Sequence, residues 1–231
     1  MRVAALFSGG KDSTYALYIA QQRGWEVSDL VTVVPQDDDS MLYHVPNIGL
    51  APLLSECLGI RLTSREAGHG EDMELEALRE ALGGLRVEGL VMGTIASDYQ
   101  KSRVDALCHE LGMRCYAPLW RQGQALLLAD YLAAGFRILI TGVAAEGLDE
   151  SWLGREIDEK ARLELLELNK KHGLSPCGEG GEYETLVIDG PNFLKRLQIV
   201  EARKDFKGSS GIYRVLKAEA VQKDSRHGGQ I

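Results

Sequence analysis

Long hydrophobic runs are missing from this sequence. No apolar stretch approaches the roughly 20 residues that a membrane-spanning helix needs. Met1 and Arg2 lead directly into an expected strand rather than into the apolar segment of a signal peptide. We therefore expect a cytoplasmic protein that has no membrane partner.

Cysteine is scarce and scattered along the chain. The four cysteines form no C-x-x-C pair, which argues against a zinc site and against a disulfide framework. They are instead expected to be buried thiols in a reducing compartment. The four are Cys57, Cys108, Cys115 and Cys177.

Positive charge is also in deficit. Lysine and arginine number 26 against 34 aspartates and glutamates, which gives a formal net charge of −8. This balance argues against broad electrostatic attraction to nucleic acid, so no stable nucleic-acid binding is expected. The 231 residues, 45% of them apolar, suffice for one large or two small domains with a proper core.

The most informative stretch is Val3–Ala16, with the sequence VAALFSGGKDSTYA. Five apolar residues, Val3–Phe7, predict a buried strand, and a helix is expected from Lys11 to about Arg23, closed by Gly24. A strand, a glycine-rich turn and a helix N-terminus in this order make an anion site. The N–H groups of the first helical turn have no partner within the helix, and the helix dipole adds positive potential there.

The residue types of the turn fit a phosphate. Gly9 and Gly10 allow a positive φ and a close approach of the backbone, Ser8 and Ser13 add hydroxyls, and Lys11 adds a cation. The common nucleotide P-loop, G-x-x-x-x-G-K-[ST], is absent because Asp12 follows the lysine. The alternative is a tight turn with a helix N-cap.

Four further strands and the helices between them predict a doubly wound, Rossmann-like α/β domain over residues 1–120, with a parallel sheet of about five strands. Ligands of such sheets bind beyond the carboxyl ends of the strands, near the switch in strand order. The stretch 94–103 follows the strand Gly89–Gly93 and is therefore a second candidate for the nucleotide. In it, Ser97 or Asp98 can cap a helix.

The remaining residues predict a smaller α+β domain over 121–222 and a disordered tail over 223–231. The strands of the α+β domain are expected near 137–143, 185–188, 196–203 and 211–220, and its strongest amphipathic helix is expected over Glu156–His172. The segment Ser175–Pro191, SPCGEGGEYETLVIDGP, sets glycines between glutamates and must begin as a shaped loop.

Five separated stretches resemble one family, the diphthine–ammonia ligases, which are PP-loop ATP pyrophosphatases of the N type. The stretches are Ser8–Ser13, Ser40–Asn47, Gly93–Arg103, Leu148–Arg155 and Glu179–Pro191. The resemblance implies a nucleotide-binding domain, a family-specific C-terminal domain and a reaction. In that reaction the carboxylate of diphthine, a modified histidine of translation elongation factor 2, is amidated with ammonium, and ATP is split into AMP and pyrophosphate. The resemblance leaves the oligomeric state open, a homo-oligomer included.

The resemblance and the residue types together assign the nucleotide side. Lys11, Asp12 and Asp98 are the candidate catalytic residues, and Mg²⁺ is expected to screen the phosphates. Asp12 either holds that ion or orients the loop, and Asp98 is either a plain N-cap or a nucleotide or magnesium residue. The candidate ATP-binding residues are Ser8, Gly9, Gly10, Lys11, Asp12, Ser13, Gly93 and Thr94.

The substrate side is assigned to anionic and polar residues. Tyr183 with flanking carboxylates is expected to hold the trimethylammonium group of diphthine by cation–π and charge contacts. A glycine-rich turn with solvated glutamates is the alternative. Asp149 or Glu150 can bind the amine or ammonia. Trp152 is either a substrate-side residue or a core or interdomain residue. The candidate substrate-binding residues are His44, Asn47, Glu150, Glu179, Gly180, Gly181, Glu182, Tyr183 and Glu184.

Three readings stay open on the sequence. The run Asp37–Asp39 can hold a metal, although a solvated turn is favoured. No cysteine–histidine glutaminase arrangement is seen, so the expected nitrogen source is free ammonium or ammonia delivered from elsewhere. The alternatives to diphthine amidation are a PP-loop enzyme acting on tRNA or a small carboxylate, and a nucleotide-binding protein without turnover.

Overall fold

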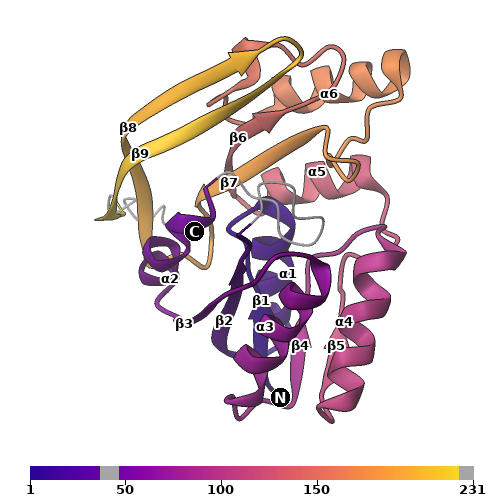
Figure 1. Ribbon diagram of the computed structural model, residues 1–231. Coiled ribbons are helices and arrows are strands. Elements are labelled where there is room, and N and C mark those ends of the chain that lie inside the picture. The colour runs from indigo at the N-terminus through magenta and orange to yellow at the C-terminus, as the bar shows by residue number, and fades with distance from the viewer. Residues whose placement is uncertain (37–46, 224–231) are drawn as a thin grey trace, which may run out of the picture.

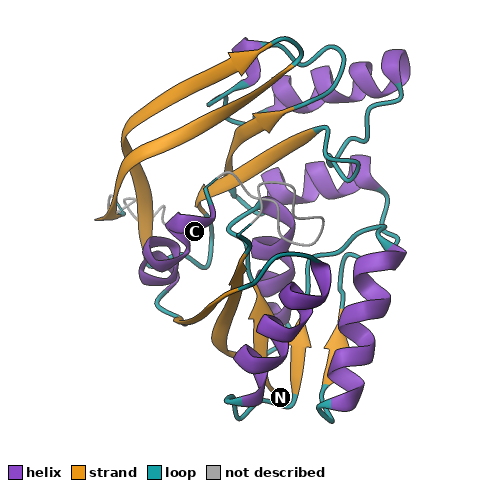
Figure 2. Cartoon of the chain, in the orientation of Figure 1, coloured by secondary structure: helices purple, strands orange, loops and turns teal. Residues whose placement is uncertain are grey.

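The computed structural model describes residues 1–36 and 47–223. Its N-terminal half is built on a parallel sheet (Figure 1), which has five strands. The strand order is β3-β2-β1-β4-β5, so β1 and β4 flank the switch in order. Each strand except β5 leads through a helix to the next (Figure 2). The strands are β1 (Arg2–Leu6), β2 (Glu26–Val34), β3 (Arg61–Glu66), β4 (Gly89–Val91) and β5 (Arg114–Tyr116).

Helices cover both faces of this sheet because its central strands are apolar on both sides. Along β1, Val3 and Ala5 belong to the cluster that contains α1 and α2, whereas Ala4 packs in the cluster of α3 and α4. The expected doubly wound α/β sheet is therefore confirmed. The helices are α1 (Lys11–Gln22), α2 (Ala51–Leu58) after the 3₁₀ turn η1 (Ile48–Leu50), α3 (Glu71–Gly83) and α4 (Asp98–Glu110).

The second half forms a separate four-stranded antiparallel sheet of order β7-β6-β9-β8, which confirms the smaller α+β part. Its last two strands make a long hairpin that arches over the molecule in Figure 1. Its elements are α5 (Gln124–Ala133), β6 (Arg137–Val143), the 3₁₀ turn η2 (Glu150–Trp152), α6 (Glu159–His172), β7 (Tyr183–Asp189), β8 (Lys195–Lys207) and β9 (Ser210–Gln222).

Strands β7, β8 and β9 are longer than expected from the sequence, and two further boundaries differ for reasons that the structure shows. Helix α6 begins at Glu159 rather than at Glu156, because Glu156 forms a β-bridge with Leu139 and the carboxylate of Asp158 caps the helix. Lys223 belongs to the folded part rather than to a tail, since its ammonium pairs with Asp189 at 2.7 Å. The predicted disorder of the residues after it lies outside the described residues.

The two halves share their largest apolar cluster, which runs from the residues of α1 and α2 into those of β6, β7 and α6. A main-chain bond ties β7 to the turn after β1, where the N–H of Val187 donates to the carbonyl of Gly9 at 2.9 Å. The second sheet therefore covers the carboxyl end of β1.

Within residues 1–36 and 47–223, no helix is long and apolar enough to cross a membrane.

Candidate functional site

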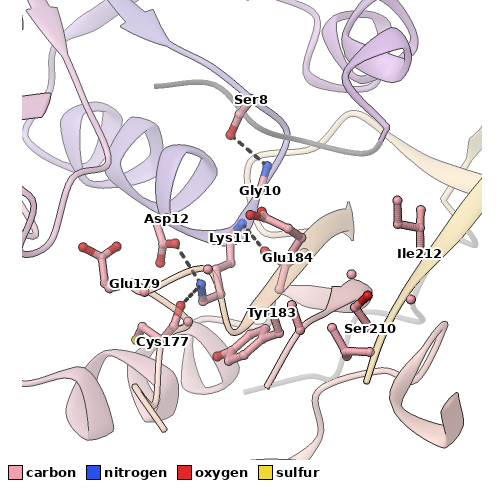
Figure 3. A pocket seen from close by; sticks show the side chains of 18 of the residues that line it. Ser8, Gly10, Lys11, Asp12, Cys177, Glu179, Tyr183, Glu184, Ser210 and Ile212 are labelled. Carbon is pink, nitrogen blue, oxygen red and sulfur yellow. Dashed lines mark hydrogen bonds and ion pairs between the residues drawn. The ribbon is translucent and has the colours of Figure 1, made fainter. Parts of the chain in front are cut away.

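A cavity of about 1130 Å³ opens where the turn after β1 meets the second sheet (Figure 3). Most of its lining comes from three segments far apart in sequence: the turn and first residues of α1, the glycine–glutamate loop with the start of β7, and the tip of the β8–β9 hairpin. The end of β6 and the start of α4 complete it. Its lining includes Ser8, Gly10, Lys11, Asp12, Ser13, Ser97, Gln100, Gly142, Cys177, Glu179, Gly180, Gly181, Tyr183, Glu184, Thr185, Lys204, Asp205 and Lys207.

The turn after β1 holds its own shape through its serines. Gly9 has φ +80°, which favours glycine, and a Cβ there would also push against the Leu54 side chain at 2.6 Å. The Ser8 and Ser13 hydroxyls lie 3.0 Å apart, and the Gly10 N–H donates to Ser8 Oγ at 3.3 Å. These groups line the cavity at the N-terminus of α1, where helix geometry favours an anion.

The first N–H of α1 is capped by a residue of the second sheet. The backbone N–H of Lys11 donates to Thr185 Oγ1 at 3.1 Å, although the two residues are 174 positions apart. Thr185 was not among the predicted site residues. Only its place directly after the glycine–glutamate loop could have drawn attention to it.

Thr185→Val is expected to lower the free energy of unfolding by about 1 kcal/mol, because the buried Lys11 N–H loses its acceptor while the volume is kept. Urea unfolding followed by circular dichroism measures this as a lower midpoint with an unchanged slope. Thr63→Val on β3 is the matched control, since its hydroxyl makes no hydrogen bond among the described residues. Equal effects of the two substitutions would contradict the capping role.

The Lys11 ammonium is buried under the turn, with the residue only 4% exposed. It donates to Asp12 Oδ2 at 2.8 Å and to the Cys177 carbonyl at 2.5 Å, and it lies 5.1 Å from the Tyr183 ring centroid. Burial alone would lower its pKa, but Asp12, Tyr183 and Cys177 together raise that pKa above its usual range. The side chain is therefore a permanent cation, and two acceptors leave one of its three N–H donors for an anion.

Asp12 is held from two sides. Its Oδ2 accepts from Lys11, and its Oδ1 accepts from the Tyr131 hydroxyl at 2.7 Å. Tyr131 lies on α5, is 1% exposed and was missed by the sequence prediction, because an aromatic residue on an apolar helix face carries no signal of a site. Among the described residues, no group of three or more His, Cys, Asp or Glu could by itself hold a metal ion.

Gly93 and Thr94 lie beneath the turn rather than on the cavity wall. A Cβ at Gly93 would lie 2.5 Å from the backbone nitrogen of Ser13 and 2.6 Å from the carbonyl carbon of Asp12. Gly93 is partly exposed, whereas Thr94 is buried. Neither residue lines the cavity, and the missing side chain of Gly93 lets the segment after β4 approach α1. Their contact with the nucleotide stays a prediction.

The cap of α4 is Ser97, whose Oγ accepts from the Gln100 N–H at 3.2 Å. Asp98 is the first residue of the helix, its side chain is 81% exposed, and it pairs with Arg121 at 3.6 Å. Ser97 lines the cavity and Asp98 does not. The geometry therefore gives no support to Asp98 as a catalytic residue.

The three glutamates of the glycine–glutamate loop have different surroundings. Glu179 Oε2 accepts from the Ala96 N–H at 2.9 Å, which ties the loop to the segment just before α4. Glu182 folds back onto its own loop and accepts from the N–H groups of Ser175 and Gly180 at 2.8 and 2.7 Å. Glu179 and Glu182 therefore fasten the loop rather than standing as solvated anions. Gly180 and Gly181 lie between them on the cavity wall.

Tyr183 cannot offer a free ring to a quaternary ammonium in this arrangement. The residue is 2% exposed, its hydroxyl donates to the Pro176 carbonyl at 2.5 Å, and Lys11 of the same chain already lies against its ring. The predicted aromatic contact with the trimethylammonium group is therefore replaced by an internal one. The ring instead helps to hold the Lys11 ammonium in place.

Two more of the predicted substrate residues, Asn47 and Glu150, do not line the cavity. The Asn47 amide is used twice in the fold, since it donates to the Tyr213 carbonyl and accepts from the Val215 N–H, each at 3.0 Å. Glu150 is exposed in η2 and does not line the cavity, while Trp152 is in the core. His44 and the run Asp37–Asp39 lie outside the described residues.

Comparisons with known proteins agree with the resemblance seen in the sequence. Two family models match: the diphthamide synthase N-terminal domain over residues 1–115 and the diphthamide synthase C-terminal domain over residues 124–221. A diphthine–ammonia ligase of Schizosaccharomyces pombe is 35% identical over 97% of this chain, which spans only 40% of that protein. A human diphthine–ammonia ligase is 36% identical over 85% of this chain and 82% of its own length.

A solved structure, titled as a predicted subunit of tRNA methyltransferase from Methanocaldococcus jannaschii, is a more distant likeness. It is 20% identical, covers 83% of this chain and 98% of its own, and has a TM-score of 0.44. The two family models together span nearly the whole described chain, and the relatives named above carry one and the same activity in their names. The chain therefore belongs to the diphthamide synthase family, whose named relatives are diphthine–ammonia ligases.

Proposed function

We propose that this protein catalyses the ATP-dependent amidation of diphthine on translation elongation factor 2, with ammonium as the nitrogen source and AMP and pyrophosphate as products. One observation carries the proposal: the anion-binding turn of α1 and the glycine–glutamate loop line the same cavity. A nucleotide on the first and an acceptor beside the second would meet without a large rearrangement. The family membership supports the choice of acceptor.

The chemistry requires a good leaving group on the diphthine carboxylate. Attack of that carboxylate on the α-phosphorus of ATP forms an acyl-adenylate, from which ammonia displaces AMP. As the α,β-bridging P–O bond breaks, negative charge grows on the departing pyrophosphate. Lys11 and the N-terminus of α1 line the cavity, and the remaining N–H donor of Lys11 together with that N-terminus would stabilise this charge.

Mg²⁺ fits this site only together with the nucleotide. In ATP sites the ion commonly binds one or two carboxylates and completes its shell with phosphate oxygens and water. Asp12 supplies one such carboxylate on the cavity wall, and each of its oxygens has spare acceptor capacity beyond the bonds from Lys11 and Tyr131. We assign Asp12 as the protein ligand, and the bound ion would supply charge neutralisation of the phosphates.

Product analysis tests the proposal. The protein, ATP, Mg²⁺, ammonium and diphthine-bearing elongation factor 2 are incubated, beside a Ser8→Ala/Lys11→Ala double variant. AMP and pyrophosphate should form together with the mass change for a hydroxyl replaced by an amino group on the factor, and the double variant should give neither. AMP without a change on the factor would move the acceptor to another carboxylate. The absence of AMP would leave a nucleotide-binding protein and would refute the proposal.

A further inference from the structure

Glu184 differs from the other two glutamates of its loop because its carboxylate has no partner. Glu179 and Glu182 each accept backbone N–H groups, whereas the Glu184 carboxylate makes no hydrogen bond or ion pair with any residue of 1–36 and 47–223. It nevertheless lines the cavity. Figure 3 shows the side chain beside the first turn of α1.

The position of Glu184 is set by the second sheet rather than by the loop. It is the second residue of β7 and pairs in register with Gly142 of β6. A Cβ at Gly142 would lie 3.1 and 3.2 Å from Glu184 Cβ and Cγ, so glycine makes room for this side chain. Both residues line the cavity. A strand position holds the carboxylate more rigidly than a loop position would.

The surroundings of Glu184 favour the protonated, neutral form of its carboxyl group. Burial is the main cause and raises its pKa to about 7; the Lys11 ammonium opposes this, and the Asp12 carboxylate adds to it. The other charged groups that line the cavity are Glu179, Lys204, Asp205 and Lys207. A carboxylate of this kind binds a cation when ionised and takes up a proton readily near neutral pH.

Ammonium is the one reactant of the proposed function that needs a group able both to bind a cation and to accept a proton. It is mostly protonated at neutral pH, it carries four N–H donors, and it must lose a proton before nitrogen can attack. A quaternary ammonium has no N–H to donate and gives no proton. We propose that the Glu184 carboxylate binds ammonium in the cavity and accepts its proton, so that ammonia is released beside the activated acyl group. This inference rests on the proposed function.

The step balances as follows. Ammonium gives one proton to the Glu184 carboxylate, which leaves ammonia and a neutral carboxylic acid. The nitrogen lone pair forms the C–N bond to the acyl carbon, and the C–O bond to AMP breaks with its electron pair on the phosphate oxygen. The amide nitrogen then loses its second proton to solvent, and Glu184 is deprotonated again before the next turnover.

Glu184→Gln tests the inference, because it keeps the size of the side chain and removes the negative charge and the proton acceptor. The expected result is about a 10²-fold fall in kcat/KM for ammonium. ATP–pyrophosphate exchange driven by the diphthine-bearing factor should persist, which also shows that the variant is folded. Hydroxylamine is largely unprotonated at neutral pH and needs no base. Its kcat/KM in Glu184→Gln should therefore fall by about tenfold at most, against about 10²-fold for ammonium.

The pH profile gives a second readout. Because the ionised form of Glu184 is the active one, kcat/KM for ammonium in the wild-type protein should rise with pH through a limb near the pKa of about 7 and lose that limb in Glu184→Gln. Glu201→Gln is the control: an exposed glutamate of β8 away from the cavity, expected to leave both readouts unchanged.

The outcomes separate the two claims. If the wild-type protein forms no AMP and leaves the factor unchanged, the proposed function fails. If the wild-type protein amidates and Glu184→Gln keeps its kcat/KM for ammonium and the acid limb, the inference is overturned. Loss of the exchange reaction in Glu184→Gln would place the carboxylate before the ammonium step and would overturn it as well.

Discussion

Replacing Lys11 with methionine is expected to lower the rate of AMP formation by roughly 10²–10³-fold, the loss typical of removing one donor to a developing oxyanion. The lysine has a single N–H left for an anion, and no other lysine or arginine among the described residues of the turn and of α1 lines the cavity. Single-turnover measurement of AMP with the diphthine-bearing factor reports this rate directly.

The same substitution should also affect stability. The buried Cys177 carbonyl and one Asp12 oxygen lose their donor, which lowers the free energy of unfolding by about 1–3 kcal/mol. Lys170→Met on α6 is the control, because that side chain is 71% exposed and should change neither quantity. AMP formation at the wild-type rate in Lys11→Met would show that the cation does not serve the leaving group.

Gly93→Ala is the second prediction with a large expected effect. The added methyl group would overlap the backbone of Asp12 and Ser13, which cannot turn aside as the end of a flexible side chain could. We expect the free energy of unfolding to fall by about 3 kcal/mol and the first turn of α1 to be displaced. Urea unfolding measures the first effect, and ATP binding by calorimetry, which should weaken strongly, measures the second.

Gly83→Ala is the matched control for this substitution. Gly83 ends α3, and a Cβ there would meet nothing within 4 Å. Alanine at a helical position with free space should leave ATP binding unchanged and stabilise the protein by up to about 1 kcal/mol. If Gly93→Ala and Gly83→Ala bound ATP equally well, the close contact between β4 and α1 would not be needed for the nucleotide site.

Much of the fold could be predicted from local pattern. Val3–Phe7 is an uninterrupted apolar run followed by glycines and a helix, and such a run belongs to a central parallel strand whatever surrounds it. The start of α6 was less predictable, because the bridge between Glu156 and Leu139 depends on a partner far away in sequence. Strand pairing of this kind overrides the local helical periodicity of the segment.

The candidate site also has one part that local sequence predicts and another that depends on tertiary contacts. The sequence by itself determined the anion-binding turn, since Ser8–Ser13 draws its properties from its own glycines, hydroxyls and the helix that it begins. Only the tertiary structure decided that Thr185 caps that helix, that Tyr131 holds Asp12 and that Glu184 alone of three glutamates stays unpartnered. Residue type states which bonds a side chain can make. Which of those bonds forms depends on the donors that folding brings within reach of it.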